Sequence, residues 1–107
     1  MKTILQTIEW RSAILVAVML TVMQSVDASE NLARKYNCVA CHAVERRMVG
    51  PSFQEVAARY SNKAVAQLAA SIRKGGAGKW GAMPMPAYPQ LSEADATALA
   101  KYVLDVK

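Results

Sequence analysis

The sequence contains few of the side chains that bind metals or form cross-links. Its 107 residues include one histidine, His42, and two cysteines, Cys38 and Cys41. A structural zinc site takes four ligands, mostly cysteine and histidine, so the chain has too few of them for such a site. Two cysteines can form one disulfide at most, which would close a short loop and stabilise the fold only modestly.

Long uniform runs are also scarce. The apolar run at residues 13–23 is too short to span a bilayer comfortably. The formal net charge is +5, but the basic residues are scattered along the chain. No long basic run or alternation of basic and aromatic residues indicates binding to nucleic acid. The basic balance fits a solvated surface, anionic lipid or an acidic protein partner.

Residues 1–28 differ from the rest of the chain. The basic residues Lys2 and Arg11 precede the apolar run, and residues 26–28 are small or short, as a signal peptidase cleavage site requires. This order is typical of a secretory signal. We therefore predict a signal peptide at residues 1–28 that is cleaved after Ala28, with an uncleaved anchor as the alternative, and a single domain at residues 29–107.

The most informative stretch is C-V-A-C-H at residues 38–42. The spacing C-x-x-C-H is typical of a c-type haem attachment site. On a helix, Cys38, Cys41 and His42 would project from one face. The two thiols could then each add to a vinyl group of one porphyrin, and the imidazole could ligate the iron. A covalently held porphyrin would also stabilise a domain too small to bury much apolar surface.

Two other roles for the cysteine pair are a redox pair and a structural disulfide. A thioredoxin-like redox pair would need a strand–helix–strand context, and no strand pattern lies near residues 38–42. A disulfide between Cys38 and Cys41 needs a specific geometry that a helical segment disfavours. Haem attachment is the prediction that we adopt. Export supports it, because bacteria attach c-type haem outside the cytoplasm.

The domain is predicted to be all-α. A first helix is expected from about Glu30 to Ala40, with Ser29 as its N-cap. A second helix begins at residues 52–55, where S-F-Q-E has the pattern of a capping box. Apolar residues follow both starts at helical spacing.

Two further helices are expected. One follows the N-cap candidate Ser61 and ends at Gly75 and Gly76, with basic residues in its last turn. The other begins at Ser92. Its apolar spacing predicts a buried face made of Leu99, Tyr102, Val103 and Val106.

Residues 75–91 contain four glycines and three prolines, which exclude a regular helix. This long loop also carries aromatic and methionine side chains, so we expect it to be ordered and functional. It supplies the candidates for a second iron ligand, Met83 and Met85. The remaining candidate, Met48, follows His42 too closely to reach the opposite haem face.

Methionine is the protein ligand that would suit the sixth position of a haem that already has one histidine. Met85 lies between Pro84 and Pro86, which stiffen the backbone around it. Met83 and Met85 point in different directions in an extended segment, so both cannot ligate. We favour Met85 as the ligand over Met83, with core filling as the alternative role for both.

Four sequence patterns together resemble a known family. They are C-V-A-C-H at 38–42, M-V-G-P at 48–51, W-G-x-x-P-M-P at 80–86 and L-x-K-Y-V-L at 99–104. In these patterns residues 30–107 resemble the short bacterial class I cytochromes c, of the c-551 and c-552 type. The resemblance implies a small all-α fold in which four short helices wrap around one covalent haem c, with His42 and Met85 as axial ligands.

The resemblance also implies contacts around the haem. The carbonyl of Pro51 would accept a hydrogen bond from the second ring nitrogen of His42, which fixes the tautomer and raises ligand basicity. Trp80 would donate its indole N–H to a haem propionate, and Arg47 would lie near a propionate. The alternatives are a packing role for Trp80 and an exposed charge for Arg47. Family members commonly read P-M-P-P-N, whereas Ala87 and Tyr88 follow Pro86 here.

The predicted function is that of a monomeric, mono-haem electron carrier in the periplasm, and not of an enzyme. By resemblance, its donor would be a membrane respiratory complex and its acceptor a terminal oxidase or a haem nitrite reductase. No nucleic acid is expected as a partner, and contact with a membrane would be at most peripheral. The alternatives are a haem c subunit or module of a larger oxidoreductase, and a haem protein with an open sixth site.

Overall fold

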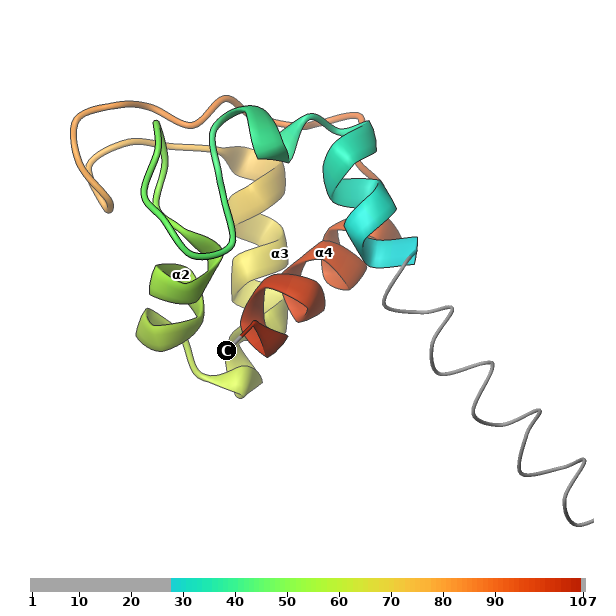
Figure 1. Ribbon diagram of the computed structural model, residues 1–107. Coiled ribbons are helices and arrows are strands. Elements are labelled where there is room, and N and C mark those ends of the chain that lie inside the picture. The colour runs from blue at the N-terminus through green and yellow to red at the C-terminus, as the bar shows by residue number, and fades with distance from the viewer. Residues whose placement is uncertain (1–27, 107) are drawn as a thin grey trace, which may run out of the picture.

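The computed structural model describes residues 28–106, which form a helical domain (Figure 1). Residues 28–35 are helical and are followed by the short 3₁₀ helix η1 at Cys38–Ala40. The remaining helices are α2 (Phe53–Arg59), η2 (Asn62–Ala64), α3 (Val65–Lys74) and α4 (Glu93–Asp105). Within the described residues the one β-type pairing is an isolated bridge between Gly76 and Met85. The all-α prediction is therefore confirmed.

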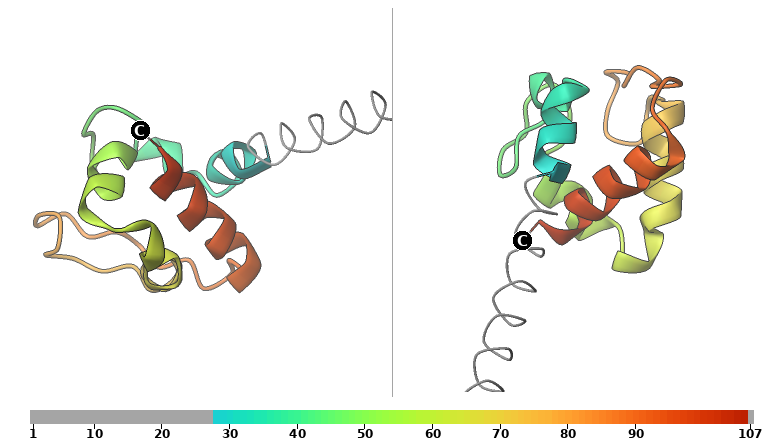
Figure 2. Two further views of the ribbon diagram at one scale, coloured as in Figure 1. Left: turned by 90° about the horizontal axis from the view of Figure 1, so that it is seen from below. Right: turned by 90° about the vertical axis from the view of Figure 1, so that its right-hand side faces the viewer.

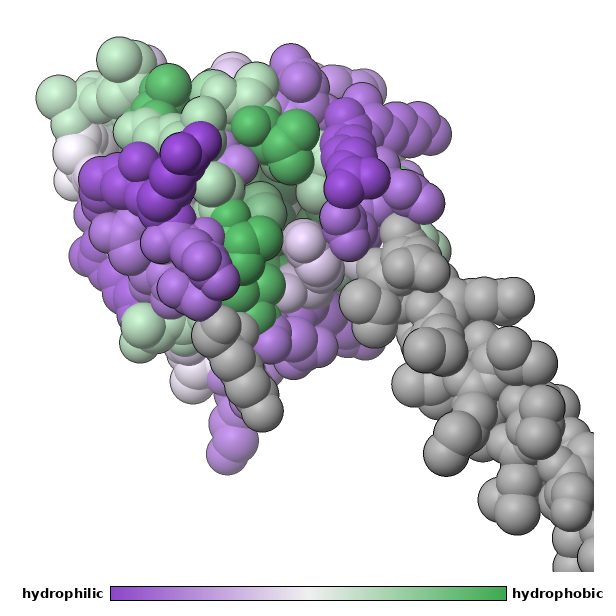
Figure 3. Space-filling view, viewed as in Figure 1, coloured by the Kyte–Doolittle hydropathy of each residue, from purple (hydrophilic) through white to green (hydrophobic). Residues whose placement is uncertain are grey.

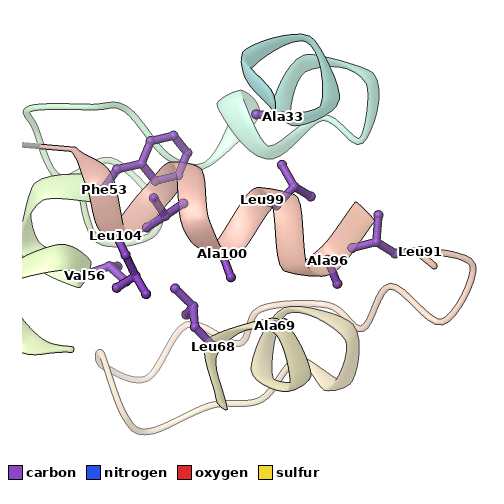
Figure 4. Close-up of a cluster of buried hydrophobic side chains, with 11 residues drawn as sticks. Ala33, Phe53, Val56, Leu68, Ala69, Leu91, Ala96, Leu99, Ala100 and Leu104 are labelled. Atoms are coloured by element: carbon purple, nitrogen blue, oxygen red, sulfur yellow. The ribbon is translucent and has the colours of Figure 1, made fainter. Parts of the chain in front are cut away.

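The core lies where α4 crosses the other helices. In Figure 4, α4 runs through the buried cluster, with Leu68 and Ala69 of α3 on one side and Ala33 on the other. The helix at residues 28–35 lies beside α4 (Figure 2), and the hydroxyl of Tyr36 donates to Asp95 of α4 at 3.2 Å. The buried residues of α4 itself are Ala96, Leu99, Ala100, Val103 and Leu104. Its predicted face was therefore correct at Leu99 and Val103, whereas Tyr102 and Val106 are only half-buried.

Serine side chains begin two of the main helices, as predicted. Ser52 and Glu55 form a complete capping box at α2, because each side chain bonds to the backbone of the other. Ser92 accepts from the backbone N–H of Asp95 at α4. Ser61 is the N-cap residue of η2, but its side chain makes no capping bond there. Such caps typically contribute about 0.5–2 kcal/mol to stability.

The first helix ends earlier than expected. The predicted helix is confirmed over residues 30–35, but its helical backbone ends at residue 35 and not at Ala40, and Ser29 lies within the helix and is not its N-cap. Asn37 has φ 61 and ψ 27, a left-handed conformation that breaks the helix before the cysteines. Asparagine is among the few residues with a side chain that adopt this conformation readily.

The segment from Gly75 to Leu91 is an irregular loop that projects from the end of α3 (Figure 1). Gly75 ends α3 with φ 66, in the region where glycine is favoured. The loop then folds back, and Gly76 pairs with Met85.

No helix in the described range, residues 28–106, is long and apolar enough to cross a membrane. The predicted signal peptide falls on residues 1–27, apart from Ala28, and so lies outside the described residues.

Candidate cofactor site

A single cavity brings together all of the predicted site residues. It has a volume of about 490 Å³, within the range of roughly 300–1,000 Å³ that is common for ligand pockets. Figure 3 shows apolar side chains gathered around the hollow on this face, between hydrophilic surfaces. The predicted residues that line it are Cys38, Cys41, His42, Arg47, Pro51, Trp80 and Met85.

One turn of backbone presents the cysteine pair and the histidine to this cavity. The N–H groups of Cys41 and His42 both donate to the carbonyl of Cys38, at 3.2 and 3.0 Å. This single turn brings Cys38, Cys41 and His42 together, an arrangement that a longer helix was expected to provide. Cys38 and Cys41 are free, half-buried thiols, and burial raises the pKa of the Cys38 thiol because the thiolate loses hydration.

The imidazole of His42 is held on two sides. Its Nδ1 lies 2.7 Å from the carbonyl oxygen of Pro51, which is the contact that the resemblance implies. Its ring stacks on Phe53 with centroids 5.7 Å apart. A carbonyl can only accept, so Nδ1 carries the proton and Nε2 keeps its lone pair for a metal.

Gly50 was missed as a site residue by the sequence reasoning, although it lies within the M-V-G-P pattern. A β-carbon at this position would come within 2.4 Å of Cε1 of His42, a distance that real β-carbons do not reach. The backbone N–H of Gly50 also donates to the carbonyl of Cys41 at 2.9 Å. Glycine is therefore required for the loop to pass this close to the imidazole ring.

The two candidate methionines differ in their surroundings. Both line the cavity, but Met83 is 67% exposed, whereas Met85 is half-buried. Met85 is also fixed by two backbone hydrogen bonds with Gly76, of 2.8 and 3.1 Å. These differences favour Met85 as the residue whose thioether is held in place.

Trp80 and Arg47 meet at one rim of the cavity. Trp80 is half-buried against the core, and its carbonyl accepts from Nη1 of Arg47 at 3.1 Å. Arg47 also pairs with Glu55 at 3.3 Å. Arg59, which the sequence reasoning missed, places its guanidinium 4.5 Å from the centroid of the Trp80 ring. No local signal predicts this contact, because the two residues are far apart in the sequence.

Lys79 is a second basic residue near Trp80 that the sequence reasoning missed. Its carbonyl accepts a hydrogen bond from Nη1 of Arg59 at 2.7 Å. The ammonium group of Lys79 in turn contacts the hydroxyl of Tyr60 and lies 4.2 Å from the centre of its ring. These contacts tie the tip of the loop to the end of α2 and place three cations, Arg47, Arg59 and Lys79, at one side of the cavity.

The donor set of the cavity fits haem c. Two thiols, an imidazole with a free Nε2 and a half-buried thioether line one largely apolar hollow. Soft sulfur and imidazole ligands suit haem iron. Within residues 28–106, no group of three or more histidine, cysteine, aspartate or glutamate side chains is placed to hold a bare metal ion. The two thiols, the imidazole and the thioether around an apolar hollow fit a haem, whose porphyrin nitrogens supply the other ligands of the iron.

Comparisons with known proteins also indicate a c-type cytochrome. The family model for cytochrome c matches residues 26–107. Cytochrome c-552 of Nitrosomonas europaea is 44% identical over 90 residues, which cover 82% of this chain and 87% of the relative. Cytochrome c-551 of Azotobacter vinelandii is 46% identical over 83 residues, covering 76% of this chain and 100% of the relative.

A solved structure agrees with these matches. The crystal structure of wild-type Nitrosomonas europaea cytochrome c552 superposes with a TM-score of 0.69 and 45% identity, over 73% of this chain and 99% of that one. The chain belongs to the cytochrome c family. It has the class I fold of the c-551 and c-552 type, and it is an electron-transfer protein with one covalently bound haem c rather than an enzyme.

Proposed function

We propose that this protein carries single electrons in the periplasm on a haem c whose iron is held by His42 and Met85. The observation that supports this most is the meeting of four residues in one cavity: Cys38, Cys41, His42 and Met85. When bound, the haem supplies an iron that cycles between the ferrous and ferric states.

The two cysteines fix the cofactor. The thiols of Cys38 and Cys41 would hold the haem, since each could add its S–H across one vinyl group to give one thioether bond. Both sulfurs lie on one turn of backbone, so this attachment also sets the position of His42. A haem held in this way would stay with the protein between encounters with its redox partners.

The two proposed axial residues have different effects on the iron. Pro51 accepts from Nδ1 of His42 and thereby orients Nε2 and raises its basicity. The thioether of Met85 is soft and neutral, so it favours ferrous iron and raises the reduction potential. Retention of both ligands in the two redox states would limit structural change on electron transfer.

Two rim residues are proposed to interact with the haem propionates. The indole N–H of Trp80 would donate to one carboxylate, and Arg47 would lie near a carboxylate. The support is that both line the cavity and that Arg47 is already tied to the Trp80 carbonyl. The cation at this rim would offset the charge of a partly buried carboxylate.

The partner surface is proposed to surround this rim. Arg47, Arg59 and Lys79 lie at or beside the cavity, and the chain carries a net charge of +5. These cations would steer an acidic partner toward the haem edge. The proposed donor is a membrane respiratory complex, and the proposed acceptor is a terminal oxidase or a haem nitrite reductase. Export would depend on cleavage of the predicted signal peptide after Ala28, and the carrier would work as a monomer.

The visible spectrum and mass of the purified, exported protein test this function. We expect a mass that begins near Ser29 plus one haem that resists acid–acetone extraction. We also expect a low-spin ferric spectrum with the weak far-red band of a methionine–iron bond. A high-spin spectrum without this band would contradict the carrier and favour an open sixth site. A complex with other subunits on gel filtration would favour a module of a larger oxidoreductase.

A further inference from the structure

The C-terminal end of α3 holds the methionine segment of the loop at several points. Gly76 and Met85 exchange two backbone hydrogen bonds, of 3.1 and 2.8 Å. The backbone N–H of Tyr88 donates to the carbonyl of Arg73 at 2.9 Å. The side chain of Arg73 then reaches further along the loop, where its Nε donates to the carbonyl of Leu91 at 2.9 Å.

Gly75 brings these two segments into direct contact. A β-carbon on Gly75 would come within 2.5 Å of the carbonyl oxygen of Met85 and within 2.8 Å of the next backbone atoms. The backbone after Met85 therefore lies against the end of α3. Residues 85–91 are therefore hydrogen-bonded to Gly76 at their start and to Arg73 toward their end.

Both ends of the hydrogen bond between Arg73 and Leu91 belong to well-packed parts of the domain. α3 is packed into the core through Leu68 and Ala69, and Leu91 is only 1% exposed. Arg73 also lies 3.5 Å from the carboxylate of Glu93, just after the N-cap of α4. Its side chain therefore joins α3, the end of the loop and the start of α4.

A loop of this length needs such an anchor if it carries an iron ligand. The closure of a flexible loop costs conformational entropy, and the glycines at 75, 76, 78 and 81 all have positive φ. Pro84 and Pro86 stiffen the backbone locally, but they do not fix its position relative to the rest of the domain. That position depends on contacts with a rigid element, which here is α3.

We propose that Arg73 is a positioning residue for Met85. The two hydrogen bonds that Arg73 makes to the loop, with Tyr88 and with Leu91, set how often the thioether of Met85 leaves the haem iron. The proposal rests on the proposed ligation by Met85. It assigns to Arg73 a role in the sixth coordination site, although its guanidinium bonds to the end of the loop rather than to the methionine. Removal of the side chain would leave the backbone bonds of Met85 with Gly76 and of Tyr88 with residue 73, but it would remove the hydrogen bond to the carbonyl of Leu91 and so loosen the end of the segment.

The test compares cyanide binding to the ferric holoproteins of Arg73→Gln and the wild type. Cyanide can bind only when the methionine has left, so its binding rate at low concentration reports the open population. We expect Arg73→Gln to bind cyanide roughly two- to tenfold faster, the factor that corresponds to one hydrogen bond of ordinary net strength. Arg73→Lys keeps the charge but has a methylene at the position of Nε, so it should also bind faster than the wild type.

Two control variants separate positioning from general effects. Arg34→Gln removes one positive charge from an exposed ion pair with Glu30 and should bind cyanide at the wild-type rate. Leu104→Ala weakens the buried core at a residue that does not line the cavity and should not speed binding. A wild-type rate in Arg73→Gln, or equal acceleration in Leu104→Ala, would overturn the role of Arg73.

A further variant tells failure of this inference from failure of the proposed ligation. If Met85→Ala keeps the far-red methionine–iron band, Met85 is not the ligand and the premise falls. If Met85→Ala loses the band while Arg73→Gln binds cyanide at the wild-type rate, the ligation stands and the role of Arg73 alone is wrong.

Discussion

The α-carbon of Gly50 lies against the imidazole ring of His42, so close that a β-carbon there would come within 2.4 Å of Cε1. The same ring is bonded to the carbonyl of Pro51 and stacked on Phe53. Three residues of the short segment 50–53 therefore fix the orientation of the one histidine in the sequence. A ligand held in this way needs little rearrangement when it binds iron.

Gly50→Ala should disturb this arrangement. The added methyl group has to displace the imidazole or the backbone at residue 50, and overpacking of this kind typically costs about 1–3 kcal/mol. We expect a lower free energy of unfolding in denaturant and a shifted haem absorption spectrum. Ala58→Ser is the control, since Ala58 is exposed on α2 and does not line the cavity, so this variant should leave the spectrum unchanged. Wild-type stability and spectrum in Gly50→Ala would refute the close contact.

Ser52→Ala should weaken the start of α2. The serine hydroxyl accepts from the backbone N–H of Glu55 at 3.0 Å, and loss of such a cap costs about 0.5–2 kcal/mol. Chemical denaturation of the holoprotein measures the change. Ser61→Ala is a matched control, because Ser61 makes no side-chain capping bond and its loss should change stability by less than about 0.5 kcal/mol. Equal effects of the two substitutions would contradict the assignment of the cap.

Glu55 should make stability depend on pH. The backbone N–H of Ser52 lowers the pKa of its carboxyl group, with a smaller contribution from Arg47. Because the folded-state pKa is the lower one, this stabilisation is present above the unfolded-state pKa near 4.5 and is lost as pH falls through the folded-state value. Glu55→Gln should therefore be less stable than the wild type at neutral pH, and the difference should shrink in acid.

Denaturant unfolding of Glu55→Gln across this pH range measures the effect. Glu45→Gln removes the same charge from an exposed position and serves as the comparison. Curves for Glu55→Gln and the wild type that stay parallel from neutral to acid pH would show that the carboxylate of Glu55 does not stabilise the fold.

Salt should slow electron transfer to an anionic oxidant. Lys79 lines the cavity, and Arg59 is bonded to its carbonyl. The attraction of these two cations for an anion is screened as ionic strength rises. With ferricyanide as oxidant, we expect the second-order rate constant to fall with added salt. Lys79→Gln should lower it more than Lys101→Gln, which removes an exposed charge on α4. A rate that does not change with ionic strength would instead favour an apolar docking patch, with the cations as a solvated surface.

Local signals in the sequence predicted the helices that depend on local contacts. The capping box at Ser52 and the cap at Ser92 mark the starts of α2 and α4, because a cap is formed by residues within one turn of each other. The end of the first helix was predicted too late, because apolar spacing continued to Val39 while the backbone at Asn37 is left-handed. Val39 is in fact 46% exposed.

Contacts between distant segments could not be predicted in the same way. The spacing of Cys38, Cys41 and His42 indicates a haem site by itself, and the prolines beside Met85 distinguish it from Met83. The contact of Arg59 with Trp80 and the bond from Arg73 to Leu91 depend on how the loop folds back onto α2 and α3. No pattern within one segment encodes such a contact, so these residues emerged only from the three-dimensional structure.

The proposed pair of axial ligands, His42 and Met85, is tested most directly by the far-red absorption band of the ferric holoproteins of Met85→Ala and Met83→Ala. Met85→Ala should lose the band, open the sixth position and lower the reduction potential, because a ligand that favours ferrous iron is gone. Met83→Ala should keep the band, because Met83 is largely exposed. Loss of the band in Met83→Ala and its retention in Met85→Ala would contradict the account and place the ligand two residues earlier in the loop.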